Sequence, residues 1–180
     1  MFSDGPLSRR PRETIRYGTG RCALGRLLVA TSERGIASIV IRKSLSALQQ
    51  EIAARFPKAQ LVRDEKGQQA LVAKVARYIA APFRPFTLPL DIRGTELQKR
   101  VWDEVRKIPF GQTSTYAKVA ATIGMPRAIR AVASSCSRCW LGFAIPCHRV
   151  LHSGARPGSR NSPQYDKVNY EAKLAARRRK

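Results

Sequence analysis

Three prolines close together interrupt the chain near its middle and constrain its fold more than any other feature. The segment Ala81–Asp91 contains Pro82, Pro85 and Pro89, and proline both removes a backbone donor and breaks a helix. We therefore expect a linker here, with at most a short edge strand at Thr87–Ile92. The patterns on the two sides differ, which predicts an α/β (α+β) fold made of two unlike halves.

The N-terminal half has the pattern of a small β-meander with helices. Three runs of strand-forming residues are separated by glycine-containing turns, at Thr14–Tyr17, Leu24–Thr31 and Ile36–Ile41. Apolar residues at helical spacing then predict helices over Leu45–Phe56 and Gln69–Ile79. We expect a domain over residues 14–92, preceded by a basic arm at residues 1–13.

The C-terminal half, residues 93–180, opens with a strong signal for a helix start. Thr95 and Gln98 match a capping box, in which each side chain binds a backbone amide at the helix end. An apolar stripe at helical spacing follows, and Pro109 ends it. We expect a helical domain to begin here.

Two further short helices predict a helix-turn-helix. The first is expected at Tyr116–Ile123 and ends at Gly124, and the second has Pro126 in its first turn and runs to about Cys139. Such pairs bind DNA, but they also occur in ordinary helical cores. Spacing alone leaves both alternatives open.

Charge favours the DNA-binding alternative. The chain has 34 Lys and Arg against 12 Asp and Glu, a formal net charge of +22, and no Asp or Glu occurs between Val105 and Tyr165. This excess indicates a polyanionic partner, with nucleic acid ahead of an anionic membrane surface. No apolar run is long enough to span a membrane. We expect no membrane partner and a cytoplasmic location, associated with the nucleoid in a bacterium.

The sharpest chemical feature is the dipeptide Cys147-His148, which follows Pro146. A cysteine becomes a nucleophile when a base or a positive potential favours its thiolate. A turn at Pro146, or a bridging water, would let the histidine take the proton. The same dipeptide also fits a buried structural cysteine beside a surface histidine.

Cysteine usage bears on compartment and on metal binding. Four cysteines in 180 residues are too few for a disulfide scaffold, which favours a reducing compartment. An alternative is a zinc site in a structural DNA-binding module, with the ligands Cys136, Cys139, Cys147 and His152.

Several short motifs occur in order along the chain: Gly94-Thr95 with Gln98, Val101-Trp102, Ile108-Pro109 followed by Gly111, Thr115-Tyr116, Ile123-Gly124 with Pro126, Arg130-Ala131-Val132, and Ile145-Pro146-Cys147-His148-Arg149-Val150. In this order they resemble the 6-O-alkylguanine-DNA alkyltransferases, also called methylated-DNA–protein-cysteine methyltransferases. The N-terminal half resembles the transferase half of bacterial adaptive-response proteins. The resemblance covers about Tyr17 to Val150.

The resemblance implies a fold and a chemistry. The N-terminal domain would be ribonuclease-H-like, and the C-terminal domain would carry the helix-turn-helix. Cys147 would accept an alkyl group from the 6-oxygen of guanine, and also from the 4-oxygen of thymine, and keep it. His148 would be the water-relayed base, Tyr116 would donate a proton to the departing base, and Pro146 and Val150 would line the pocket. No cofactor or metal is implied, and each molecule would act once.

The resemblance also implies how DNA is bound. The helix-turn-helix would enter the minor groove of double-stranded DNA as a monomer, with the damaged nucleotide flipped out because a stacked base is out of reach. Arg130 would enter the stack in its place. The contacts would come from one face rich in small residues, with Tyr116, Arg127, Ala128, Arg130 and Ala131 on it.

Three departures from the family pattern stand out. Cys139 occupies the position of a bracing asparagine, and Ser159–Pro163 stands where the family has a Gly-Tyr loop. The glutamate that orients the histidine aligns with Arg178. Asp166 and Glu171 are the acids left to replace it, and Glu171 is the candidate, although neither spacing matches. Binding should survive these departures better than transfer, so a damage sensor that transfers slowly or not at all is a second hypothesis.

Overall fold

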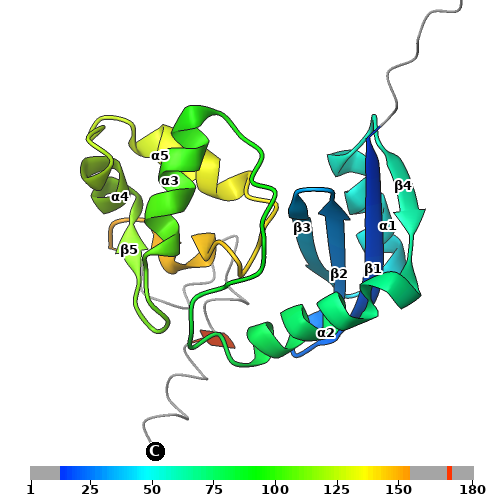
Figure 1. Cartoon of the computed structure of the whole chain (residues 1–180). Helices are drawn as coiled ribbons and strands as arrows, with labels where there is room; N and C mark the ends of the chain where they lie inside the picture. The colour runs from blue at the N-terminus through cyan, green and yellow to red at the C-terminus, as the bar shows by residue number, and fades with distance from the viewer. Residues whose placement is uncertain (1–12, 155–169, 172–180) are drawn as a thin grey trace, which may run out of the picture.

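A four-stranded sheet forms the N-terminal half of the computed structural model, which describes residues 13–154 and 170–171 (Figure 1). Its spatial order is β3-β2-β1-β4, with the bounds β1 (Thr14–Cys22), β2 (Gly25–Ser32), β3 (Gly35–Arg42) and β4 (Gln60–Arg63). The first three strands are antiparallel neighbours, which confirms the meander, although β1 runs five residues beyond its predicted end. β4 was not predicted; it is short and pairs in parallel with β1.

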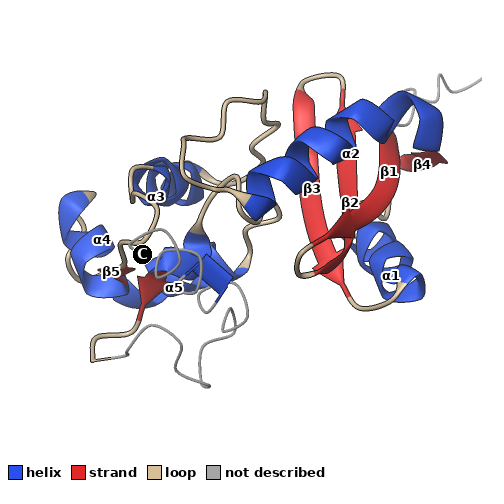
Figure 2. Cartoon of the chain, turned by 90° about the horizontal axis from the view of Figure 1, so that it is seen from below, coloured by secondary structure: helices blue, strands red, loops and turns tan. Residues whose placement is uncertain are grey.

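Helices α1 (Leu45–Arg55) and α2 (Glu65–Ala80) lie on opposite faces of this sheet (Figure 2). Successive residues of β2 therefore alternate between two cores, with Leu28 packed on the α1 side and Leu27 on the α2 side. α2 begins four residues before its predicted start because the Asp64 side chain accepts the Gly67 N–H at 2.8 Å and caps it. In the described part of the chain no helix is long and apolar enough to cross a membrane.

The proline-containing segment is a linker, as predicted, and it covers the outer edge of β3. The expected edge strand at Thr87–Ile92 is reduced to a single bridge, in which the Ile36 N–H donates to the Pro89 carbonyl at 2.9 Å. Further along β3, the Ile39 N–H donates to the carbonyl of Trp140 at 2.8 Å. Both halves of the chain thus satisfy donors that an open edge strand would expose.

The C-terminal half contains three helices, α3 (Glu96–Arg106), α4 (Tyr116–Thr122) and α5 (Ile129–Ser137). The predicted capping box is present at α3, since the Thr95 N–H donates to Gln98 Oε1 at 2.9 Å and the Gln98 N–H donates to Thr95 Oγ1 at 3.3 Å. α4 and α5 form the expected pair of short helices.

The second helix of the helix-turn-helix was predicted to start at about Pro126 and to run to about Cys139, and both bounds were wrong. Gly124 has φ +74°, a conformation that favours glycine, and it ends α4. A separate turn follows, closed by the Ala128 N–H on the Met125 carbonyl at 2.8 Å. Pro126 belongs to this turn rather than to the first turn of α5. α5 ends at Ser137, so Cys139 lies beyond it.

One apolar cluster joins the two halves. Buried side chains of α2, such as Val75 and Ile79, belong to the same cluster as Val101 and Trp102 of α3. The Trp102 Nε1–H donates to the Ser135 carbonyl at 3.0 Å and ties α3 to α5. The three C-terminal helices are therefore fixed to each other and to the sheet.

Candidate active site and nucleic-acid interface

A pair of two-residue strands brings distant parts of the site together. β5 (Ser114–Thr115) and β6 (Val150–Leu151) are parallel, with Ser114 opposite Val150. β5 leads directly into Tyr116, the first residue of α4, and β6 directly follows the 3-10 turn Cys147–Arg149. The rings of Tyr116 and His152 meet edge to face with centroids 5.0 Å apart. The pairing therefore places Tyr116 beside the Cys147 turn.

Cys147 is buried, with 4% of its surface exposed. Its N–H donates to the Ile145 carbonyl at 2.8 Å, and the Arg149 N–H donates to the Pro146 carbonyl at 2.9 Å, so the backbone turns sharply at Pro146. Hydrogen bonds with the thiols of Cys136 and Cys139, together with burial, raise the pKa of Cys147 well above its ordinary value. The resting side chain is thus a thiol, and a base is needed to activate it.

His148 is held by a carboxylate from the end of the described chain. Its Nε2 lies 2.8 Å from Oε1 of Glu171, and both side chains are buried. When the carboxylate accepts the Nε2 hydrogen, Nδ1 is the unprotonated, basic nitrogen of the neutral ring. The Phe143 ring packs against the His148 ring, with the two centroids 4.9 Å apart. Phe143 has φ 69°, an uncommon conformation for a residue with a side chain.

Arg149 fixes Glu171 in place. Its Nε and Nη2 donate to the two carboxylate oxygens at 2.8 and 2.9 Å, and its Nη1 donates to the Ile108 carbonyl at 2.7 Å. Burial alone would raise the pKa of Glu171, but the hydrogen bonds from His148 and Arg149 outweigh it and lower the pKa below its ordinary value. Glu171 is therefore a carboxylate at neutral pH.

The position of Glu171 resolves one of the departures seen in the sequence. Its spacing did not match the family pattern, yet its side chain reaches His148. No role was predicted for Arg149 beyond its place in the motif around Cys147. The arginine directly after the histidine was a usable sequence signal, because its guanidinium can donate to the same carboxylate that holds His148.

Tyr116 is half-buried, and burial, followed by the nearby Cys136 and Cys147, raises the pKa of its hydroxyl. The phenol is thus protonated at neutral pH and able to donate. It lies at the start of α4, where the Thr115 side chain accepts the Lys118 N–H at 3.1 Å and caps the helix.

The helix-turn-helix presents basic side chains to solvent. Lys118, Arg127, Arg130 and Arg138 are all exposed. Ala128 and Ala131 are partly exposed near Arg130, and Ile129, directly before Arg130, is exposed. Ala128 gives α5 no side-chain cap, and its first turn has no acidic residue. Such a helix start attracts anions.

Pro146 and Val150, the two expected pocket residues, are placed differently with respect to the cavity beside the linker. Pro146 and Val150 are both buried. Pro146 lines a cavity of about 570 Å³ between the linker and α3, together with Phe83, Phe110 and Arg149, whereas Val150 does not. Cys147 and Tyr116 are also absent from the described residues that line this cavity. The structure thus brings together Cys147, His148, Tyr116 and Glu171.

The zinc alternative has no support in the geometry. Among residues 13–154 and 170–171, no three His, Cys, Asp or Glu side chains are placed to hold a metal ion. The His152 ring packs edge to face against Tyr116. The predicted loop at Ser159–Pro163 and the positions Asp166 and Arg178 lie outside the described residues.

Two family models match consecutive parts of the chain. Residues 15–92 match the ribonuclease-like domain of 6-O-methylguanine DNA methyltransferase, and residues 96–176 match its DNA-binding domain. The constitutive methylated-DNA–protein-cysteine methyltransferase of Bacillus subtilis is 31% identical over 75% of this chain and 79% of its own length.

The chain also matches part of a longer relative. The bifunctional transcriptional activator/DNA repair enzyme Ada of Escherichia coli is 44% identical over 76% of this chain, but this match covers 39% of that protein. The chain therefore spans about two fifths of this relative's length.

A solved structure shares the fold of the described chain. The 6-O-methylguanine methyltransferase of Mycobacterium tuberculosis has a TM-score of 0.69 at 24% identity, and the match covers 88% of this chain and 93% of that one. The same TM-score is found for a complex of the Mycobacterium tuberculosis protein with DNA, at 25% identity.

Proposed function

Since the chain belongs to the methylated-DNA–protein-cysteine methyltransferase family, we propose that it repairs DNA directly by moving an alkyl group from the 6-oxygen of guanine to Cys147. The 4-oxygen of thymine is a second substrate. The observation that carries the proposal is the bond between His148 and Glu171 at 2.8 Å, directly beside a buried cysteine.

Activation of Cys147 is a proton transfer. Glu171 holds the ring so that Nδ1 of His148 receives the thiol proton through a water molecule, and the negative carboxylate stabilises the imidazolium that forms. Arg149 keeps Glu171 ionised and fixed. Because the pKa of the resting thiol is raised, this relay is what makes the thiolate available when substrate is present.

The thiolate sulfur then attacks the alkyl carbon, and the carbon–oxygen bond breaks. The electron pair of that bond moves into the guanine ring, which gains a proton from Tyr116. The raised pKa of Tyr116 supports this role, because the phenol holds its proton until negative charge develops on the base. The thioether is stable, so each molecule reacts once.

DNA binding uses the helix-turn-helix in the minor groove of the duplex. The small side chains Ala128 and Ala131 allow close approach, and Arg130 fills the gap left by the flipped nucleotide. Exposed Arg127 and the uncapped start of α5 contact phosphates. One monomer serves one lesion, in the cytoplasm, without a metal or a cofactor.

The test is a single-turnover mass measurement. The protein is mixed with a duplex oligonucleotide that carries one 6-O-methylguanine, and its intact mass and peptide masses are recorded. We expect one methyl group on the peptide that contains Cys147 and none in a Cys147→Ala variant. Tight binding to the oligonucleotide without a mass change would reject alkyl transfer and favour the damage sensor.

A further inference from the structure

The loop that leads to Cys147 begins at a residue held by the N-terminal half. Trp140 packs on the α1 side of the sheet, where its ring meets Phe56 edge to face with centroids 5.3 Å apart. The next residue, Leu141, is 3% exposed and belongs, together with Cys147, to the apolar cluster that joins the two halves. The chain therefore passes from one core to the other between Trp140 and Leu141.

Arg55, the last residue of α1, binds the start of this loop. Its Nη1 donates to the Trp140 carbonyl at 3.2 Å and to the Ser38 hydroxyl at 2.6 Å. The central carbon of its guanidinium lies over the Trp140 ring, 5.8 Å from the centroid. The Arg55 side chain is 16% exposed and Ser38 is fully buried. These are hydrogen bonds from a charged donor in surroundings with little water, which makes them strong.

Glu51 fixes the direction of the Arg55 guanidinium. It forms ion pairs with Nη2 of Arg55 and with Arg42. Because Nη2 is held by Glu51, the rigid fork of the guanidinium directs Nη1 toward Trp140. Arg42 instead donates to the carbonyl of its own neighbour, Ile41, at 2.7 Å. The two arginines thus share one carboxylate, but their carbonyl partners differ.

The backbone connects Trp140 to Cys147 through two consecutive turns. The Ile145 N–H donates to the Leu141 carbonyl at 2.8 Å, and the Cys147 N–H donates to the Ile145 carbonyl at 2.8 Å. A shift of the chain at Trp140 therefore reaches Cys147. Misplacing a reacting group by about 1 Å can slow a reaction by about 10²-fold, even when the change is far from the chemistry.

We propose that Arg55 is a positioning residue for alkyl transfer, whose guanidinium holds the Trp140 carbonyl and so places the Cys147 sulfur for attack on the alkyl carbon. The reaction that it serves rests on the proposed function, whereas the bracing of the loop does not. Arg55 acts through the backbone of the loop, so the N-terminal half takes part in the reaction. Its effect falls on the rate of transfer after binding, because the helix-turn-helix that holds the DNA is a separate part of the chain.

The test compares Arg55→Met with the matched control Arg42→Met. Each variant removes one guanidinium from Glu51 and leaves the other, so the carboxylate keeps a partner in both. Arg55→Met also removes the donor to the Trp140 carbonyl, whereas Arg42→Met leaves it in place. Urea unfolding identifies conditions in which wild type and both variants are fully folded, and all further measurements are made there.

Amide hydrogen exchange, followed by NMR on the full chain without DNA, reports the loop directly. In Arg55→Met we expect the Ile145 and Cys147 amides to exchange about tenfold faster, the equivalent of one hydrogen bond from a charged donor. The amides of β1 and β2 should keep their wild-type rates, and Arg42→Met should change neither set. Unchanged loop amides in Arg55→Met, equal changes in the two variants, or faster exchange throughout the sheet would each overturn the bracing role.

Single-turnover methyl transfer supplies the second readout, measured over a concentration series of duplex that carries 6-O-methylguanine. We expect the maximal rate of Arg55→Met to be about tenfold below that of wild type, with the half-saturating duplex concentration unchanged. Arg42→Met should match wild type in both. A normal maximal rate, or a loss caused by weaker binding, would refute positioning by Arg55. Absence of transfer in wild type would instead reject the proposed function, and hydrogen exchange would still decide whether Arg55 braces the loop.

Discussion

His148 Nε2 lies 2.8 Å from Oε1 of Glu171, a residue 23 positions further along the chain, and both side chains are almost completely buried. This pair links the Cys147 turn to the end of the described chain. The same carboxylate also accepts two hydrogen bonds from Arg149. Removing it leaves a buried guanidinium and an unoriented imidazole, so both the stability of the fold and the rate of the reaction should depend on it.

Glu171→Gln should slow methyl transfer by at least about tenfold, which is part of the roughly 10²–10⁴ that a positioned base contributes. The amide can present its NH₂ group to Nε2, which favours the wrong tautomer. The rate of single-turnover transfer measures the loss. A nitrogen-15 spectrum of labelled histidine, simple with two histidines in the chain, should show the Nε2–H form in wild type and a mixture in the variant. Exposed Glu33→Gln is the control. An unchanged tautomer with a slow rate would contradict the positioning role.

Arg130→Ala should reduce repair of duplex DNA about tenfold more than repair of the same lesion in a single strand. Only the duplex requires a base to leave a stack, which costs a few kcal/mol. Arg138→Ala removes the same charge from the other end of α5, where the side chain is also exposed, and should affect both substrates alike. Equal losses for Arg130→Ala on the two substrates would exclude insertion into the stack.

Affinity for undamaged duplex should fall steeply as salt rises, because the basic face of the helix-turn-helix displaces counterions from phosphates. Lys118→Gln and Arg127→Gln should each make the slope of log affinity against log salt shallower by about 1. Lys58→Gln, exposed in the N-terminal half, should leave the slope unchanged. Fluorescence anisotropy over a salt series measures the slope, and a shift from Lys58→Gln equal to the others would place the DNA elsewhere.

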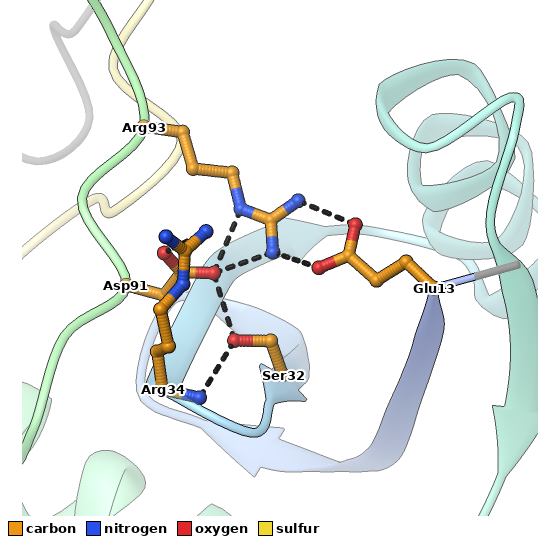
Figure 3. A network of polar contacts seen from close by, with 5 residues as sticks. All are labelled: Glu13, Ser32, Arg34, Asp91 and Arg93. Carbon is orange, nitrogen blue, oxygen red and sulfur yellow. Dashed lines mark hydrogen bonds and ion pairs between the residues drawn. The ribbon is translucent and has the colours of Figure 1, made fainter. Parts of the chain in front are cut away.

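An ion-pair network at the end of the linker predicts that the folded state becomes less stable in acid (Figure 3). Asp91, 4% exposed, accepts hydrogen bonds from Arg93 and Ser32, and Arg93 also binds Glu13. Burial would raise the pKa of Asp91, but these hydrogen bonds lower it below its ordinary value, and the hydrogen bond from Arg93 lowers that of Glu13. Their stabilisation is complete above about pH 5 and is lost as pH falls below about 4.

Asp91→Asn should lower the free energy of unfolding by about 2 kcal/mol at pH 7, because it removes a buried, charged acceptor from Arg93 and leaves Arg93 with Glu13 as its carboxylate partner. The deficit should shrink as pH falls, because wild type then loses the same charge. Urea unfolding at a series of pH values measures both. Exposed Asp103→Asn is the matched control. A deficit that stays constant down to pH 3 would show that the carboxylate charge is not what stabilises the linker.

Local signals predicted much of this fold. The capping box at Thr95 and the proline-containing linker depend on residues a few positions apart, and both were found as expected. β4, β5 and β6 were missed because strands of two to four residues have no periodicity to detect, and their partners are distant in sequence. The start of α5 was misplaced because Pro126 fits either a helix start or the turn that precedes it.

The same distinction, between signals from neighbouring residues and contacts distant in sequence, applies to the site. The motif around Cys147 is contiguous and therefore visible in the sequence. The partner of His148 depends on how the end of the chain packs, so spacing pointed to Arg178 while the folded chain uses Glu171.

The hydrogen bond from Ile39 of β3 to the Trp140 carbonyl, at 2.8 Å, has an evolutionary consequence. It attaches the loop that carries Cys147 to a strand of the other half, and Leu141 bridges to the same strand. The edge of the sheet therefore helps to fix the conformation of the loop that leads from Trp140 to Cys147. If the proposed repair depends on this loop, we expect homologues to vary less along this edge of β3 than along a strand remote from the site.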